Sequence, residues 1–338
     1  MKLIFRALFI GAIFFMYLQS QIFACEMCGC FMGITPYDNQ STIGVVYKYK
    51  SYSGYPGQSE PRNLFPDGSL RVGQPGTTID HAGHSGISSN SAKDFEIYRS
   101  AEIRGKYFIH HRIELNALLP YLMNSHRSGS TSMKIRGAGD LNLFAGYHAI
   151  QRMDDHLIQQ RLIAGLGIKL PTGSSKIIND ESQRVHLLMQ PGTGSTDYFT
   201  YLNYIAGYKN AGLSIYAMYK LNNSNSFGEQ IGNSLSSQAN LFYKFKKGNW
   251  ILIPAIQTYF EHCSGEFISN QYQEGTKVKE IMSGAGLDVY FKNIGLNMSF
   301  QVPVSEITSQ NELRGSCRIV LGLTYNFSQM SFLLGKEQ

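Results

Sequence analysis

Three cysteines and two methionines lie close together near the start of the chain. Cys25, Cys28 and Cys30 stand in a Cys-x-x-Cys-x-Cys spacing, with Met27 and Met32 between and after them. Thiolates and thioethers are soft ligands that suit Cu(I), so this segment could capture copper. In an oxidising compartment the same cysteines would form a disulfide. A lipid on Cys25 would leave Cys28 and Cys30 for a metal or a strained bridge. The sequence leaves these three alternatives open.

Other cysteines and histidines are weaker candidates for chemistry. The Asp-His-Ala-Gly-His segment at 80–84 could hold a metal, although a histidine pair in a loop is more often simply solvated. His110 and His111 are expected at the start of a strand, with their rings on opposite faces, where they cannot chelate together. Cys263 and Cys317 are expected on opposite faces of different strands, as unpaired packing residues.

The sequence offers little support for an enzyme or a nucleic-acid-binding protein. It contains no Gly-x-Ser-x-Gly motif, no His-Glu-x-x-His motif and no phosphate-binding loop. Removing Lys2 and Arg6 with a cleaved leader takes 30 basic residues to 28, against 24 acidic ones, which leaves a net charge of +4. That charge is too small to indicate nucleic acid as a partner. We therefore expect no catalytic residues and no nucleic-acid surface.

The elements that must position any site follow a regular rhythm of about a dozen segments that alternate apolar and polar residues. Their connections are alternately long, such as 54–93, and tight, such as Tyr107–Phe108 and Asn293–Ile294. Long loops at one rim and tight turns at the other are typical of a bacterial outer-membrane β-barrel. The expected strands are Thr42–Ser53, Asp94–Lys106, Ile109–Met123, Gly139–Ile150, Leu157–Leu170, Asp197–Tyr208, Gly212–Leu221, Gln238–Lys246, Trp250–His262, Lys279–Lys292, Gly295–Val304 and Gly315–Phe327.

Strand length separates this architecture from a soluble β-sandwich, which has the same two-residue period. Segments of nine or more residues suit a tilted membrane span of about 9–11 residues, whereas globular strands average about 5–6. The 21 Tyr and 20 Phe against a single Trp also suit strands and membrane interfaces. We predict an all-β fold: a transmembrane antiparallel up-and-down barrel of about 12 strands, in contact with lipid in the outer membrane of a Gram-negative bacterium.

The ends of the chain are interpreted as processing and targeting segments. Lys2, Arg6 and the apolar run Leu8–Leu18 predict a signal peptide over residues 1–24. Residues 25–41 are expected to form a periplasmic Cys-rich segment or a plug, residues 42–327 the barrel, and residues 328–338 a periplasmic tail. Phe327 resembles the terminal aromatic residue that outer-membrane assembly machinery recognises, although the tail follows it.

Strand parity predicts which side chains face the lumen, because successive side chains point to opposite faces. In the last segment Ile319, Leu321 and Leu323 would face lipid, while Arg318 and Thr324 would face inward. A basic residue on the lipid face at mid-depth would cost about 2–4 kcal/mol. The predicted lumen-lining charges are Lys48, Lys50, Glu96, Glu102, Arg104, Arg112, Glu114, Asp140, Arg161, Lys169, Lys220, Lys244, Glu261, Asp288, Lys292 and Arg318. They would either fill a narrow barrel or line a pathway for solute.

Two glycine-containing motifs resemble a known family. Gly137-Ala-Gly-Asp-Leu-Asn-Leu143 begins one strand, and Gly165-Leu-Gly-Ile-Lys-Leu-Pro-Thr-Gly173 ends the next. The pair resembles outer-membrane barrels of the "MetA-pathway of phenol degradation" type, which are related in outline to fatty-acid and aromatic-hydrocarbon channels. The Cys-rich start also resembles a Bacteroidetes-type subset of these barrels. The resemblance implies a channel or transporter for a small solute, a hydrophobic one among the candidates. The alternative is a copper-linked barrel that uses its Cys/Met segment.

The motif glycines are expected to have structural roles. Parity places Gly165 and Gly167 on the lumen face, where a missing side chain lets another segment approach closely. Pro171 should end strand pairing, since its nitrogen donates no hydrogen bond.

Overall fold

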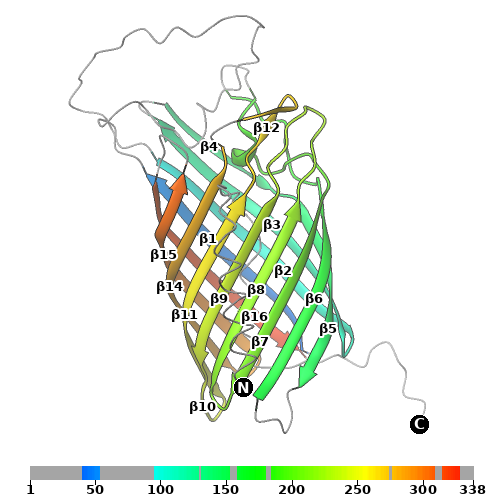
Figure 1. Cartoon of the computed structure of the whole chain (residues 1–338), viewed down its shortest axis with the longest axis vertical. Helices are drawn as coiled ribbons and strands as arrows, with labels where there is room; N and C mark the ends of the chain where they lie inside the picture. The colour runs from blue at the N-terminus through cyan, green and yellow to red at the C-terminus, as the bar shows by residue number, and fades with distance from the viewer. Residues whose placement is uncertain are drawn as a thin grey trace, which may run out of the picture.

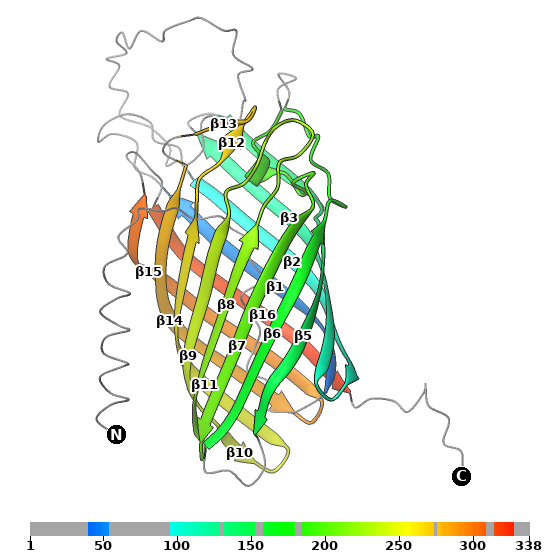
Figure 2. The ribbon, with the colours of Figure 1, turned by 45° about the vertical axis from the view of Figure 1, so that its right-hand side comes forward.

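The protein is a closed antiparallel β-barrel of twelve strands, which confirms the predicted fold class (Figure 1). The computed structural model describes residues 40–53, 95–128, 131–152, 158–179, 184–273, 276–308 and 314–327. The strands run obliquely to the barrel axis, as closure of a sheet into a barrel requires (Figure 2). Within these ranges, no helix is long and apolar enough to cross a membrane.

The elements follow one another around the barrel wall. They are β1 (Ser41–Ser53), β2 (Phe95–His110), β3 (Ile113–Ser128), β4 (Thr131–Ala138), β5 (Leu141–Arg152), β6 (Ile158–Leu170), the 3₁₀ helix η1 (Leu187–Met189), β7 (Asp197–Tyr208), β8 (Ala211–Leu221), β9 (Ser234–Tyr243), β10 (Phe245–Lys247), β11 (Trp250–Cys263), β12 (Phe267–Ile268), β13 (Gln271–Tyr272), β14 (Val278–Phe291), β15 (Ile294–Thr308) and β16 (Arg314–Phe327).

Two positions in the wall are each shared by two strands. β4 and β5 both pair with β3, so together they occupy one position. β9 and β10 do the same beside β11, joined through a Phe245–Leu252 pair below and a 2.9 Å hydrogen bond from Ser264 N to Asn233 O above. The first and last strands pair directly, from Ser41–Phe327 to Ser53–Arg314. The barrel therefore closes between its two ends in sequence.

Some strand boundaries differ from those predicted. The predicted turn Tyr107–Phe108 is wrong: β2 continues through these residues to His110, and the turn is His111–Arg112. Tyr107 and Phe108 keep the exposed–buried alternation, and no Gly, Pro or Asn marks the true turn. The prediction for His110 and His111 fails for the same reason. Their rings lie 3.9 Å apart because the pair spans the turn rather than a strand.

Strand β4 was not expected. Its buried face includes Ile135, but its outer face carries the exposed Lys134 and Arg136. The prediction looked for apolar residues at every second, outward-facing position, and in β4 two of these positions are basic. Exposed bases on the outer face also indicate that the β3–β4 hairpin reaches beyond the hydrocarbon, because a base at mid-membrane is costly.

Between its rims, the outer surface of the barrel is an apolar belt. Leu166 is 71% exposed, Ile256 69% and Leu323 57%, and each alternates with side chains that face inward. A soluble protein does not leave such a continuous apolar surface in water. Together with barrel closure, this belt identifies the chain as a transmembrane barrel of the bacterial outer-membrane kind.

An aromatic girdle lies at the rim of tight turns. Its exposed members come from strand ends at that rim, on both halves of the barrel. They are Tyr107, Tyr147, Tyr208, Tyr243, Phe245, Trp250, Phe291 and Tyr325. Aromatic side chains are favoured at the membrane–water interface, so this girdle sets the depth of that rim.

The two rims differ as the sequence predicted. Tight turns such as 209–210, 248–249 and 292–293 form one rim, where Lys209, Gly248 and Lys292 adopt positive φ. At the other rim lie the connections from β6 to β7, from β8 to β9 and from β11 to β14, which the structure describes over residues 171–179, 184–196, 222–233, 264–273 and 276–277. In bacterial outer-membrane barrels the short turns are periplasmic. We therefore call the loop side the outer mouth.

Candidate functional site

The candidate site is the lumen, where most of the predicted charges lie. Those that form ion pairs with described residues are Lys48, Lys50, Glu96, Glu102, Arg104, Glu114, Asp140, Lys169, Lys220 and Glu261. Asp288 accepts a 2.8 Å hydrogen bond from Asn297, Arg318 donates one of 3.1 Å to Gln301, and Arg161 is buried. Arg112 and Lys292 lie exposed in periplasmic turns, because β2 and β14 end before them. Lys244 lies between β9 and β10, at the same rim.

A network of buried ion pairs joins strands on different parts of the wall. Lys48 lies 2.8 Å from Glu102, which also pairs with Arg104. Lys50 lies 2.7 Å from Glu280, and 3.8 Å from Glu261. Glu280 and Glu261 are almost fully buried. Because β1 is three strands away from β14 in the sheet, the Lys50 contacts connect separated parts of the barrel across its interior.

The two family-like motifs meet at Asp140. Its Oδ1 accepts a 2.9 Å hydrogen bond from Gly173 N, and its Oδ2 accepts bonds of 2.9 Å from Thr193 N and Oγ1. Lys169 completes the site, 3.1 Å from Asp140 and 2.6 Å from Asp197. Thr193 follows the loop residues that carry η1 inside the barrel. The motif residues therefore anchor this loop.

The motif glycines in β6 make room for aromatic rings from β7. A Cβ on Gly165 would meet Tyr201 Cε1 at 2.2 Å, and one on Gly167 would meet Phe199 Cζ at 2.2 Å. The rings thus lie directly on the bare backbone of the neighbouring strand. This close approach supports the structural role predicted for both glycines. Pairing in β6 ends at Leu170, before the proline, as expected.

These rings are part of an apolar wall formed by β5 to β8. Phe144 lies 5.7 Å from Phe199 and 5.6 Å from Tyr201, measured between ring centroids. Tyr201 stacks on Tyr216 at 5.8 Å. Ile163, Met218, Tyr259 and Met282 pack in the same cluster. Aromatic and thioether groups therefore line part of the lumen, on the strands that also carry the basic Arg161 and Lys220.

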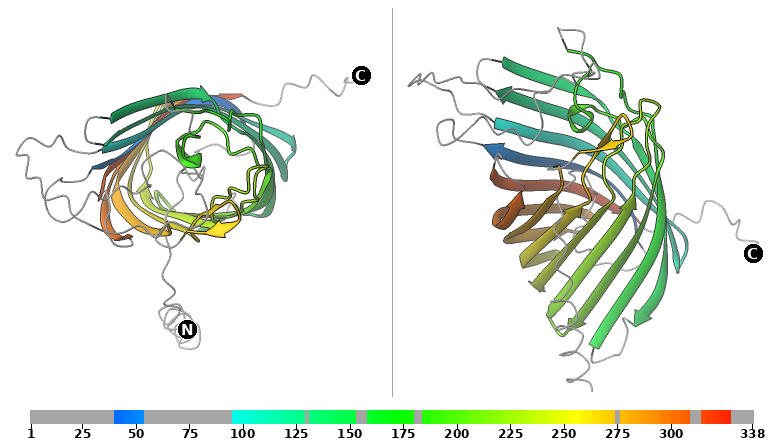
Figure 3. Two further views of the ribbon diagram at one scale, coloured as in Figure 1. Left: turned by 90° about the horizontal axis from the view of Figure 1, so that it is seen from above. Right: turned by 45° about the horizontal axis from the view of Figure 1, so that its top comes forward.

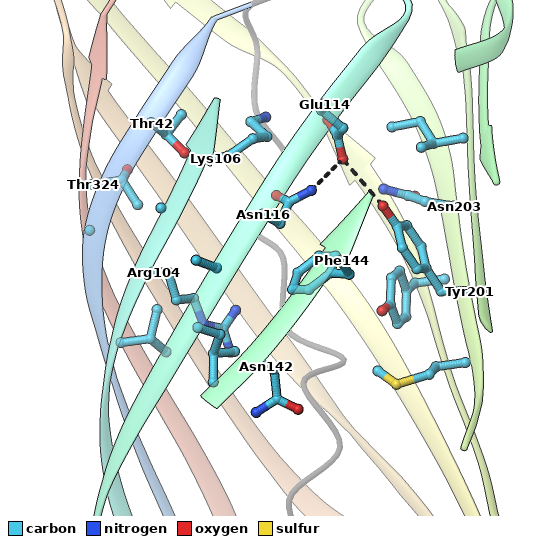
Figure 4. A pocket seen from close by; sticks show the side chains of 18 of the residues that line it. Thr42, Arg104, Lys106, Glu114, Asn116, Asn142, Phe144, Tyr201, Asn203 and Thr324 are labelled. Carbon is cyan, nitrogen blue, oxygen red and sulfur yellow. Dashed lines mark hydrogen bonds between the residues drawn. The ribbon is translucent and has the colours of Figure 1, made fainter. Parts of the chain in front are cut away.

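A cavity of about 150 Å³ lies in front of this wall (Figure 4). Beside Phe144 along the wall lie Asn116 and Glu114 of β3, and next to them Lys106 and Arg104 of β2. Glu114 is held by Asn116 and His148, each at 3.2 Å, and by the Tyr201 hydroxyl at 3.5 Å. The barrel interior is therefore not completely filled by the described side chains.

The outer mouth is narrowed by the loop that Asp140 anchors. Seen from above, η1 lies inside the ring of strands (Figure 3). Met189 is buried against Tyr52 and Tyr98, and its carbonyl accepts a 3.1 Å bond from Asn124. Leu187 packs with Ile231 and Cys263. We refer to residues 184–193 as the inner loop.

Two ion pairs tie the inner loop to other loops at the mouth. Arg184 lies 2.9 Å from Glu229, and His186 lies 2.9 Å from Glu266. Burial opposes a charged imidazole at His186, but Glu266, with Glu96 and Glu229 further away, outweighs burial and raises the pKa of His186 above its ordinary value. The ring is therefore charged over a wider pH range than a free histidine, and the pair is strengthened accordingly.

Several lumen residues were missed by the sequence analysis, for identifiable reasons. Glu280 has the same parity as Asp288 and could have been found by the rule that found Asp288. His126 lies beyond the predicted end of its strand. His186 and Glu266 belong to loops, where parity gives no information.

The predicted metal ligands Cys25, Met27, Cys28, Cys30 and Met32 lie outside the described residues, as do the 80–84 segment, the signal peptide and the tail. In the part of the chain that the structure describes, no group of three or more His, Cys, Asp or Glu is placed to hold a metal ion. Cys263 and Cys317 are free thiols, as predicted.

Comparisons with known proteins find relatives at the level of structure alone. No family model and no curated protein matches the sequence. The fold is similar to the COG4313 outer membrane channel from Pseudomonas putida F1, with a TM-score of 0.56, 16% identity, and coverage of 87% of this chain and 100% of that one.

Two further solved barrels are more distant. The β domain of the Bordetella autotransporter BrkA has a TM-score of 0.42 and 12% identity, over 86% of this chain and 100% of that one. A Pseudomonas aeruginosa FadL homologue has a TM-score of 0.37 and 10% identity, over 86% and 90%. At these identities the shared feature is the fold, that of an outer-membrane barrel.

Proposed function

We propose that this protein is an outer-membrane channel that passes a small solute through the barrel lumen. The observation that carries the proposal is the cavity of about 150 Å³, enclosed by a closed wall and lined by polar groups as well as aromatic ones. A barrel that served only as a membrane anchor would be more stable with this space filled by side chains, because a packed interior is more stable than one that contains a void. The resemblance of the motifs at 137–143 and 165–173 to transporter-type outer-membrane barrels supports the same proposal.

The inner loop is the proposed outer constriction of this pathway. A second, smaller cavity lies beneath it, lined by Leu187 and Leu188 of the loop, Lys169 and Lys220 of the wall, and Pro120. Solute would pass the loop, reach the central cavity and leave at the periplasmic rim. The aromatic wall favours a solute with an apolar part, since burial of apolar surface is favourable by about 25 cal/mol per Å².

Liposome swelling tests this proposal. Full-length protein reconstituted in liposomes should admit arabinose faster than sucrose, because a narrowed lumen discriminates by size. Liposomes that contain heat-denatured protein are the control. Equal swelling with native and denatured protein in every solute would rule out the channel.

The spacing of Cys25, Cys28 and Cys30 favours one alternative, a copper-linked barrel. Elemental analysis after incubation with Cu(I) should then find copper in the wild type and much less in a Cys28→Ser/Cys30→Ser variant. Cys317→Ser is the matched control, because this thiol lies far along the chain on the barrel wall. The same copper content in all three proteins would remove this alternative.

A further inference from the structure

The central cavity is lined by two chemically different kinds of side chain. Phe144 of β5 and Tyr201 of β7 present rings to it, and Arg104 and Lys106 of β2 bring cationic side chains (Figure 4). A ligand that contacts both kinds of group must carry an apolar body and an anionic group. The polarity of the cavity is therefore the starting point for assigning a class of solute.

Formal charge on the cavity lining is strongly positive. The basic lining residues among those described are Arg104, Lys106, Arg161 and Lys220, and the acidic one is Glu114. Glu114 already accepts hydrogen bonds from Asn116 and Tyr201, and contacts His148. An enclosed site with low-dielectric walls concentrates the potential of such charges, and so raises the local concentration of anions.

The positive balance persists when the nearest ion-pair partners are included. Arg104 shares Glu102 with Lys48, and Lys220 shares Asp197 with Lys169, which also pairs with Asp140. Six basic groups then face four acidic ones, which leaves a net charge of +2.

Lys106 is the group best placed to bind an anion. It lies on β2, one inward position below Arg104, and its Nζ is 5.4 Å from the centroid of the Phe108 ring. The carboxylate that acts on it electrostatically is Glu114, which the three contacts above hold on β3. An ammonium that lies over an aromatic ring and borders a cavity can make a charge-assisted hydrogen bond to an entering carboxylate.

We propose that the cavity binds a small amphipathic organic anion, a carboxylate carried on an aromatic or branched apolar body. This assignment rests on the proposed channel function and names its class of solute. The carboxylate lies toward Lys106 and Arg104, and the body packs against Phe144 and Tyr201. Small cations are disfavoured by the same charges.

Planar-bilayer recording with full-length protein tests the assignment. Under a KCl gradient the reversal potential should have the sign of anion selectivity, and benzoate should reduce the chloride current by occupying the cavity. Lys106→Gln should shift selectivity toward cations, and should weaken the benzoate block about tenfold, which corresponds to about 1.4 kcal/mol. Lys247→Gln is the matched control, because Lys247 is exposed at the periplasmic rim.

Two further variants keep the test decisive if Lys106→Gln does not assemble. Lys106→Arg should retain both anion selectivity and the block. Phe144→Leu should weaken the block by benzoate, because it removes a ring against which the apolar body packs. A cation-selective wild type, or a benzoate block equal to that by uncharged benzyl alcohol, would overturn the anion assignment and leave the channel intact. Absence of any current would overturn the channel itself.

Discussion

At the residue scale, the β6 glycines are the clearest link between sequence and packing. Gly165→Ala should destabilise the barrel by about 1–3 kcal/mol, because its Cβ would meet the Tyr201 ring at 2.2 Å and the Ala145 carbonyl at 2.5 Å. Gly105→Ala is the matched control, since a Cβ there meets nothing within 4 Å. Urea unfolding in detergent micelles measures the difference. Equal urea midpoints for the two variants would show that the Tyr201 ring does not need the space left by the missing Gly165 side chain. Also at this scale, Leu321 tests the lipid-facing surface. The side chain is 43% exposed on β16, and Leu321→Arg should cost about 2–4 kcal/mol by placing a guanidinium in hydrocarbon. The amount of folded barrel in outer-membrane fractions should fall, whereas Leu321→Ile should leave it unchanged. Normal assembly of the arginine variant would mean that this face does not meet lipid.

At the element scale, the inner loop depends on the charge of His186. Its pKa is raised in the closed mouth, so the His186–Glu266 pair contributes fully below the ordinary histidine pKa of about 6.5 and is lost as pH rises through the raised value. Conductance should therefore increase as pH rises through that window. His186→Gln should remove this dependence, and the exposed Lys176→Gln should preserve it. A pH-independent wild-type conductance would show that the His186–Glu266 pair does not hold the inner loop in place. The sequence predicted many of the charged residues of the long strands, but not those of the loops. Strand parity located Lys48, Glu102 and Lys169 because each lies inside a long alternating segment. It could not locate His186 or Glu266, since a loop has no period, and it missed β4 because Lys134 and Arg136 point outward above the membrane.

At the scale of the whole molecule, the alternation of loops and turns fixes the orientation in the membrane. An epitope inserted between Ser226 and Phe227, in the loop after β8, should be accessible to antibody on intact cells. The same epitope inserted between Gly248 and Asn249 should be accessible only after permeabilisation. Reversed accessibility would invert the barrel, and with it the assignment of the outer mouth.

The proposed channel requires a lumen that conducts and an inner loop that restricts it. A Cβ on Gly192 would meet the Gly173 carbonyl carbon at 2.4 Å, and Gly192 N donates a 2.9 Å bond to Ser174 O, so a short linker can replace the residues between Ser174 and Pro191 without moving these two ends. The most direct measurement is single-channel conductance of the wild type and of a variant in which a Gly-Ser-Gly linker replaces residues 175–190. We predict a small conductance for the wild type and a severalfold larger one for the variant. No conductance from either protein, with both folded, would contradict the account.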